Sequence, residues 1–280
     1  MFKKSWLEDV YGTPQFPVLK EEISSLTNQH YLKKIALASK CYEFRQTAVC
    51  RLDDQKLLFR IAQKNESIDA RIDALKRITD TGKRLSAALP VINDGSISDH
   101  YRIEAIGSVI HDFPRAQEEL RTIISRADLC DAVGAAQLLE DKELAQEVFQ
   151  RAALNCRYGT DRMKAIRNIN DGNVLLRIIK AEDDGEVAMT AASRITDPDL
   201  KQSAFREIAS AERFSRLYLK YRYDAAVQLN DRELKISVLK DILETAECGV
   251  NQKSGTYTWQ DKNKLQIVND CKSVLNSLGE

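Results

Sequence analysis

Apolar residues recur along this chain at the three- and four-residue spacing of amphipathic helices. The alternating pattern of a strand is almost absent, apart from the neighbourhood of residues 255–259. The stretches 54–65 and 67–79, with a break around 64–66, are typical of two consecutive helices. The pattern therefore predicts an all-α protein built from helix pairs.

One motif recurs seven times in the same register: a small or apolar residue, three residues, Ile or Leu, one residue, and Asp. Its copies are residues 48–54, 74–80, 106–112, 135–141, 165–171, 191–197 and 225–231. Successive copies end 26 to 34 residues apart, which is the length of a helix pair. The repeat predicts an α-α superhelix, a solenoid of about seven helix pairs in which each pair packs on its neighbours.

The chemistry of the motif positions supports this interpretation. The first and fifth positions lie on one face of a helix, where a small residue allows a close helix contact. The final Asp suits the N-cap of the next helix, and Asp197-Pro198 adds proline at the first helical position. We expect all seven aspartates, Asp112 included, at or beside helix starts.

Residues 69–75, Asp-Ala-Arg-Ile-Asp-Ala-Leu, resemble the second-helix pattern of bacterial HEAT-like repeats, in which Asp precedes Arg and then a small residue. By this register the resemblance covers roughly residues 30–247. It implies a curved rod with a concave surface lined by second helices, and binding rather than chemistry as the activity. The family's first-helix proline is mostly missing, so armadillo-like and other short α-α repeats stay open as alternatives.

The periodicity divides the chain into three parts. Residues 1–29 are predicted as an N-terminal cap, with Pro14 and Pro17 marking its irregular part. Residues 30–247 form the repeat solenoid, and residues 248–280 a loop plus a capping helix over 261–278. Breaks in the repeat at 90–99 and 249–258 predict exposed loops.

Composition excludes several classes of protein. Lys+Arg and Asp+Glu both number 42, which argues against a protein whose main task is to hold a phosphate backbone. The sequence has no apolar run of membrane-spanning length and no signal-peptide pattern, so we expect a cytoplasmic protein without a membrane partner. The six scattered cysteines are expected to be reduced, mostly buried thiols, and neither metal nor cofactor is expected.

In four copies an arginine lies three residues before the first position of the motif; these are Arg45, Arg71, Arg162 and Arg222. A fifth arginine, Arg102, lies one residue out of this register. The series fits a cationic stripe on the concave face. It also fits a structural ladder in which each Arg pairs with an acidic side chain, such as the nearby Asp69 and Asp161, and the neutral net charge favours this interpretation. The sequence leaves both interpretations open.

The densest aromatic and basic cluster spans residues 214–223. Tyr221 shares an apolar helix face with Leu217 and Ala225, so it is predicted to lie in the core. Tyr218 and Tyr223 are the better surface candidates. The predicted binding residues are Arg71, Arg162, Tyr218, Arg222 and Tyr223.

No catalytic constellation is evident. Adjacent helical residues such as His111 and Asp112 point in different directions, and residues 81–83 lack the remainder of a phosphate-binding loop. We therefore expect a noncatalytic scaffold or adaptor that binds a protein or peptide on its concave face. The alternative is a nucleic-acid-binding protein resembling the HEAT-like alkylpurine DNA glycosylases; a resemblance to HEAT-like bilin lyases has no specific residue behind it.

Overall fold

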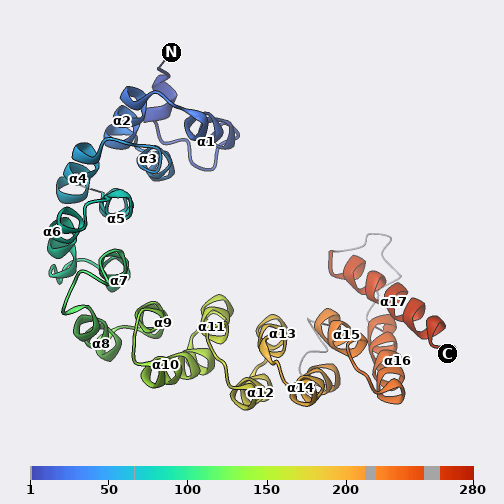
Figure 1. The fold of residues 1–280 in the computed structure, drawn as a ribbon. Helices are drawn as coiled ribbons and strands as arrows, with labels where there is room; N and C mark the ends of the chain where they lie inside the picture. Colours follow the sequence, from blue (N-terminus) through green and yellow to red (C-terminus); the bar gives the residue numbers. More distant parts are fainter. Residues whose placement is uncertain (1, 66, 212–218, 249–258) are drawn as a thin grey trace. The chain divides into compact units, whose positions relative to one another are not determined.

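A computed structural model describes residues 2–65, 67–211, 219–248 and 259–280, and it does not describe the side chains of 248 and 259–262. Within these residues the protein is all-α, with 17 α-helices and one short 3-10 helix at Lys4–Leu7. From α2 onward the helices pack as consecutive pairs (Figure 1). This is the α-α repeat arrangement that the motif predicts.

The helices fall into two compact units, residues 1–140 and 141–280, which we call unit 1 and unit 2. Unit 1 contains α1 Phe16–Ser25, α2 Gln29–Ala38, α3 Tyr42–Val49, α4 Gln55–Lys64, α5 Ile68–Arg77, α6 Thr81–Ile92, α7 Asp99–Ser108, α8 Ala116–Arg126 and α9 Leu129–Gln137. Unit 2 contains α10 Lys142–Asn155, α11 Gly159–Ile166, α12 Gly172–Ala181, α13 Gly185–Arg194, α14 Pro198–Ser210, α15 Leu219–Val227, α16 Arg232–Cys248 and α17 Trp259–Ser277.

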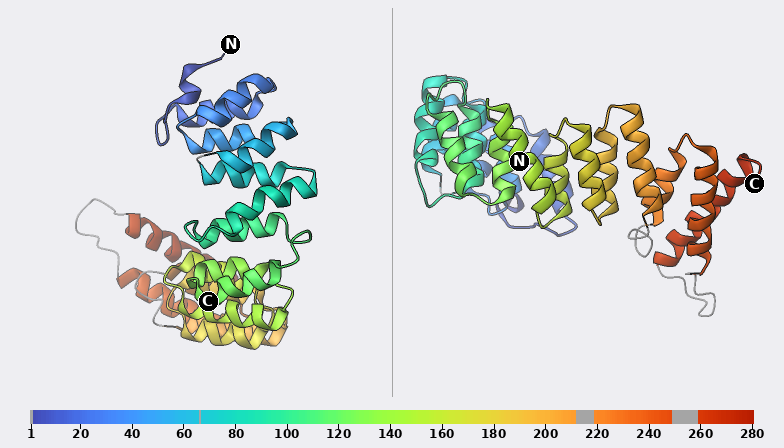
Figure 2. Two further views of the ribbon diagram at one scale, coloured as in Figure 1. Left: turned by 90° about the vertical axis from the view of Figure 1, so that its left-hand side faces the viewer. Right: turned by 90° about the horizontal axis from the view of Figure 1, so that it is seen from below.

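Each unit has two layers of helices. In unit 1 the second helices α3, α5, α7 and α9 pack side by side with α1, and the first helices lie on their other side (Figure 1). In unit 2 the second helices α11, α13 and α15 follow one another with α17, while α10, α12 and α14 form the other layer (Figures 1 and 2). The core of each unit lies between its layers.

The burial of the motif residues confirms the register. The small or apolar first residue is completely buried in all seven copies: Ala48, Ala74, Ile106, Ala135, Ala165, Ala191 and Ala225. Six of the seven Ile or Leu residues are buried as well: Leu52, Ile78, Leu139, Ile169, Ile195 and Leu229. A close approach of this kind also explains Gly185, where an added Cβ would lie 2.4 Å from the ring of half-buried Tyr221.

The final aspartates cap helices in six copies. Their carboxylates accept backbone N–H groups at the starts of α4, α6, α10, α12, α14 and α16; the residues are Asp54, Asp80, Asp141, Asp171, Asp197 and Asp231. The prediction for Asp112 is wrong. Pro114 disfavours helical backbone at the residue before it, so α8 begins only at Ala116. The Asp112 carboxylate lies instead 3.5 Å from Arg84 Nη2.

Other boundaries differ from the sequence prediction. α6 continues through Pro90 to Ile92 and α7 begins at Asp99, so the predicted loop at 90–99 is confined to 93–98. Pro90 lies in the last turn of α6, where its missing N–H costs a single hydrogen bond. Pro17 lies in the first turn of α1, a favourable position for proline. The predicted loop at 249–258 lies outside the described residues.

A glutamine on the first helix clamps the turn that precedes the next pair. Gln55 illustrates the contact: its Nε2 donates to Arg77 O at 3.3 Å, and its Oε1 accepts from Thr79 N at 2.9 Å. The same two bonds, to the third and first residues before the motif Asp, recur at Gln29, Gln117, Gln146 and Gln202. One side chain thus satisfies a carbonyl at the end of a second helix and an amide in the turn.

Candidate functional site: the second-helix face of unit 1 and the arginine series

The recurring arginines bind the ends of their own first helices. Each guanidinium donates to a backbone carbonyl at or just beyond the C-terminus of the preceding helix, where carbonyls lack partners within the helix. The pairs are Arg45 with Ser39 O and Lys40 O, Arg71 with Ala62 O, Arg102 with Ile92 O, Arg162 with Cys156 O and Arg157 O, and Arg222 with Ala209 O. The series therefore has a structural role, but its shared partner is a backbone carbonyl. The predicted pairing with an acidic side chain occurs at Arg102, Arg162 and Arg222.

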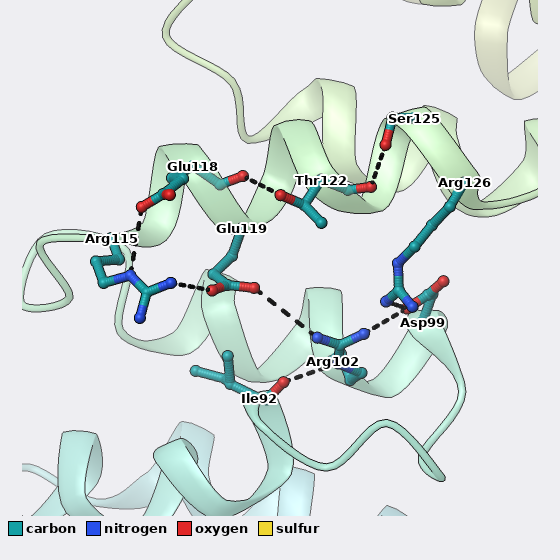
Figure 3. Close-up of polar contacts among 9 residues, drawn as sticks. All are labelled: Ile92, Asp99, Arg102, Arg115, Glu118, Glu119, Thr122, Ser125 and Arg126. Atoms are coloured by element: carbon teal, nitrogen blue, oxygen red, sulfur yellow. Dashed lines mark hydrogen bonds and ion pairs between the residues drawn. The ribbon is translucent and has the colours of Figure 1, made fainter.

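Arg102 is the centre of an ion-pair network between α7 and α8 (Figure 3). Its side chain is buried between Asp99, 2.9 Å from Nη1, and Glu119, 3.9 Å from Nη2. Arg126 binds the same Asp99 at 2.5 Å, and exposed Arg115 binds Glu119 at 3.1 Å. With Glu118, which also pairs with Arg115, the network contains three arginines and three carboxylates. Its net charge is therefore zero, so it links the two helices but has no excess charge that would attract a ligand.

Two of the predicted binding residues, half-buried Arg162 and buried Arg222, are paired with carboxylates in unit 2. Arg162 places Nε 2.9 Å from Oε2 of Glu182 and Nη2 3.1 Å from Oε1, a bidentate pair. Arg222 is 3% exposed, and its Nη2 lies 2.6 Å from Oδ2 of Asp241. The acidic partners are thus Glu182 and Asp241, whereas the sequence had suggested Asp161 for Arg162.

Of the three remaining predicted binding residues, two lie on α5 and α15 and the third lies outside the residues that the structure describes. Arg71 of α5 and Tyr223 of α15 are half-buried. Burial, followed by the nearby charge of Asp270, raises the pKa of the Tyr223 hydroxyl above its usual value. Tyr218 lies outside the described residues. Arg71 and Tyr223 belong to different units, and each stays a predicted contact residue in its own unit.

Acidic and tyrosine side chains of α3, α5 and α7 lie near one another. We define this second-helix face of unit 1 by Tyr42, Asp69, Asp73, Tyr101 and Glu104. Tyr42 is 48% exposed, and the Tyr101 hydroxyl donates to Asp69 Oδ1 at 2.7 Å across neighbouring helices. The helical spacings of Asp69 with Asp73 and of Tyr101 with Glu104 keep each pair on one side of its helix.

Cationic side chains only partly balance this face. Lys76 Nζ lies 3.4 Å from Glu104 Oε1 at the surface. Asp73 is 8% exposed; Gln46 donates to its Oδ1 at 3.5 Å, and Oδ2 has no hydrogen-bond partner within the described residues. Burial raises the pKa of the Asp73 carboxyl above its usual value.

The hydroxyl group of Tyr101 is kept protonated by the neighbouring carboxylate of Asp69. The hydrogen bond to Asp69, with burial as the second cause, raises the pKa of the Tyr101 hydroxyl to about 12. The hydroxyl therefore stays protonated as a donor under ordinary conditions. Sequence reasoning missed this face because it searched for arginines; tyrosines and acids at the starts of consecutive second helices were the signal that could have identified it.

Thiols, but neither a metal-ligating cluster nor a membrane-spanning helix, occur among the described residues. Among them, no group of three or more His, Cys, Asp or Glu side chains is arranged to hold a metal ion. No helix in that part of the chain combines the length and apolar character needed to span a membrane. Cys41, Cys156 and Cys271 are buried thiols, and Cys50 and Cys130 are exposed thiols.

The sequence matches no protein-family model and no curated protein. Among solved structures it is similar to a protein from work on the computational design of self-assembling cyclic homo-oligomers. That similarity has 15% sequence identity and a TM-score of 0.13, and it covers 92% of this chain and 88% of the other. At this TM-score the likeness adds nothing to the fold described above, which is an all-α protein of consecutive helix pairs.

Proposed function

We propose that this chain is a noncatalytic helical-repeat scaffold of the HEAT-like kind, which binds a protein or peptide through its second helices. The observation that supports the proposal is the second-helix face of unit 1. It combines two tyrosines with three carboxylates on helices that pack side by side. Tyrosine is enriched at the centres of protein interfaces because it supplies a large contact area at low entropic cost.

The charge of this face specifies the chemistry of the partner. Lys76 of α5 pairs with Glu104, and Asp69 accepts the Tyr101 hydroxyl, so the carboxylates of this face would attract a segment bearing Lys or Arg. The same negative charge repels a phosphate backbone, which disfavours the nucleic-acid alternative at this face.

The experiment is an affinity pull-down from the source organism, with mass-spectrometric identification of the partner and titration calorimetry on the purified pair. The test variant is Tyr42→Ala/Glu104→Gln, which removes an exposed ring and one charge. The matched control is Tyr158→Ala in unit 2, where the tyrosine is 60% exposed. Since the affected side chains are at the surface and surface ion pairs contribute little stability, both variants should fold.

We expect the test variant to bind the identified partner with at least tenfold lower affinity, and the control variant to bind it with unchanged affinity. Equal affinity for both variants would show that the partner binds elsewhere. A DNA duplex is titrated in parallel over a range of salt concentrations. Tight duplex binding with an affinity that falls steeply with salt would replace the scaffold by the nucleic-acid-binding alternative.

A further inference from the structure

Unit 1 contains a cavity of about 570 Å³ where the C-terminal ends of α2 and α4 meet the start of α5. Arg45, Arg60 and Lys64 supply three positive charges to its lining, and none of the described lining residues is a carboxylate. Ser39 and Ser67 add hydroxyl groups, and Ile61 adds apolar surface. The cavity is formed by helix ends and turns.

The positive charge of this cavity meets no carboxylate counter-charge among the described residues. Arg45, Arg60 and Lys64 form no ion pair with any described residue, whereas Arg102 and Arg162 of the same ladder each bind a carboxylate. Arg60 and Lys64 are exposed at the rim. Three cations without a counter-charge in a concave site concentrate anions there.

Two buried donors in the cavity wall also lack acceptors. Ser39 is 4% exposed, and its hydroxyl has no hydrogen-bond partner among the described residues. Arg45 Nε is likewise buried without a partner, although Nη1 is fixed by bonds of 2.7 Å to Ser39 O and 3.0 Å to Lys40 O. Arg45 Nη2 is 3.4 Å from Ser67 Oγ. Buried polar groups are normally hydrogen-bonded, so these two atoms leave hydrogen-bonding capacity unused in the wall. The guanidinium of exposed Arg60 and the ammonium of exposed Lys64 are the groups that a ligand's acceptor oxygens can reach.

The lining selects among anions. A phosphate monoester carries up to two negative charges and three acceptor oxygens, so it balances three cations better than a carboxylate does. Leu37 and Ile61 line the cavity beside the charges, and its volume lies in the range of small-molecule sites. We infer that this cavity binds a small organic phosphate monoester, with its phosphate at Arg45, Arg60 and Lys64 and its organic group against Leu37 and Ile61.

The test is isothermal titration calorimetry of the full chain with phenyl phosphate, inorganic phosphate and benzoate. The test variant is Arg60→Gln/Lys64→Gln, which changes two exposed side chains that form no ion pair with a described residue. Unit 2 supplies the matched control in Lys180→Gln/Arg206→Gln. These residues line a cavity of about 640 Å³ on α12 and α14 that also contains the carboxylate of Glu207.

We expect one phenyl phosphate per chain, at least tenfold weaker binding in the test variant, and binding within twofold of the original in the control. Benzoate should bind at least tenfold more weakly than phenyl phosphate. Absence of phenyl phosphate binding in the millimolar range, or equal affinity for the original chain and the test variant, would overturn the site. Inorganic phosphate binding as tightly as phenyl phosphate would overturn the assignment of an organic ligand. Circular dichroism of both variants confirms that they retain their helices.

Discussion

Replacing Arg102 by methionine tests whether the arginine ladder stabilises the repeat. The substitution keeps an unbranched apolar stem, but it removes the donor 2.8 Å from Ile92 O and the counter-charge of Asp99 and Glu119. Breaking a buried ion pair typically costs about 3–5 kcal/mol. Asp99 retains Arg126 and Glu119 retains Arg115, so we expect the low end, about 3 kcal/mol.

The control for this prediction lies in the same network. Arg115 is 64% exposed, and its ion pairs with Glu118 and Glu119 lie at the surface. Arg115→Met should therefore cost less than about 1 kcal/mol. Arg102→Lys should fall between the two, because an ammonium keeps the charge but lacks the planar fork that reaches three partners.

The assay must be local because repeat proteins can unfold in parts. Hydrogen exchange followed by mass spectrometry should show peptides of α7 and α8 exchanging on the order of 100-fold faster in Arg102→Met, since each 1.4 kcal/mol corresponds to a factor of ten. Urea denaturation measured by circular dichroism gives the accompanying loss of stability. If Arg102→Met and Arg115→Met lose the same stability, the buried ladder bond at Ile92 O contributes nothing and the reasoning is refuted.

Four further predictions follow from the contacts described. Gln55→Ala removes two hydrogen bonds from the clamp and should lower the free energy of unfolding by about 1–2 kcal/mol in a urea titration, whereas Gln63→Ala, an exposed control on the same helix, should not. Ala165→Leu or Ala191→Leu inserts methylenes at completely buried positions and should cost about 1–3 kcal/mol, visible as a lower melting temperature; unchanged melting in both would contradict the close packing. The hydrogen bond to Asp69 raises the pKa of the Tyr101 hydroxyl above its unfolded value of 10 to about 12. The stabilisation that this hydrogen bond gives the folded state is therefore complete below pH 10 and is lost as the pH rises to about 12. The stability difference between the original chain and Tyr101→Phe, measured by urea titration, should shrink over that range. Alkylation without reductant should modify exposed cysteines first and reach the buried thiols only on unfolding, and intact mass should show no disulfides; Cys50 and Cys130 are the exposed thiols, and Cys41, Cys156 and Cys271 the buried ones.

The repeat could be predicted from the sequence because each position of the motif is restricted by a physical requirement of packing or capping. A residue at a close helix contact must be small or well packed, and all seven first positions are fully buried. An Asp at a helix start accepts free N–H groups, and six of the seven do so. The exception, Asp112, shows that a proline two residues later overrides the motif by delaying the helix.

The glutamine clamp was missed for a definable reason. The two ends of each bond lie 21 to 28 residues apart in the chain, and the glutamine occupies different positions of the first helix. Gln55 is the first residue of α4, whereas Gln146 is in the second turn of α10. A search of single helices for amphipathic spacing cannot detect such a contact, because it depends on how two neighbouring pairs stack.

The arginine series shows why recurrence alone did not identify a binding surface. Every helix pair presents the same unpartnered carbonyls at the end of its first helix, so a donor at one position of the second helix is favoured in each copy. A residue that recurs with the repeat can thus be explained by the backbone of the repeat. Tyr42 does not recur in this way, although Tyr101 and Glu104 have counterparts in Tyr221 and Asp224 beside Arg222. Arg60 and Lys64 have no partner among the described residues. The departures from periodicity, rather than the periodic residues, are therefore where ligand contacts should be sought.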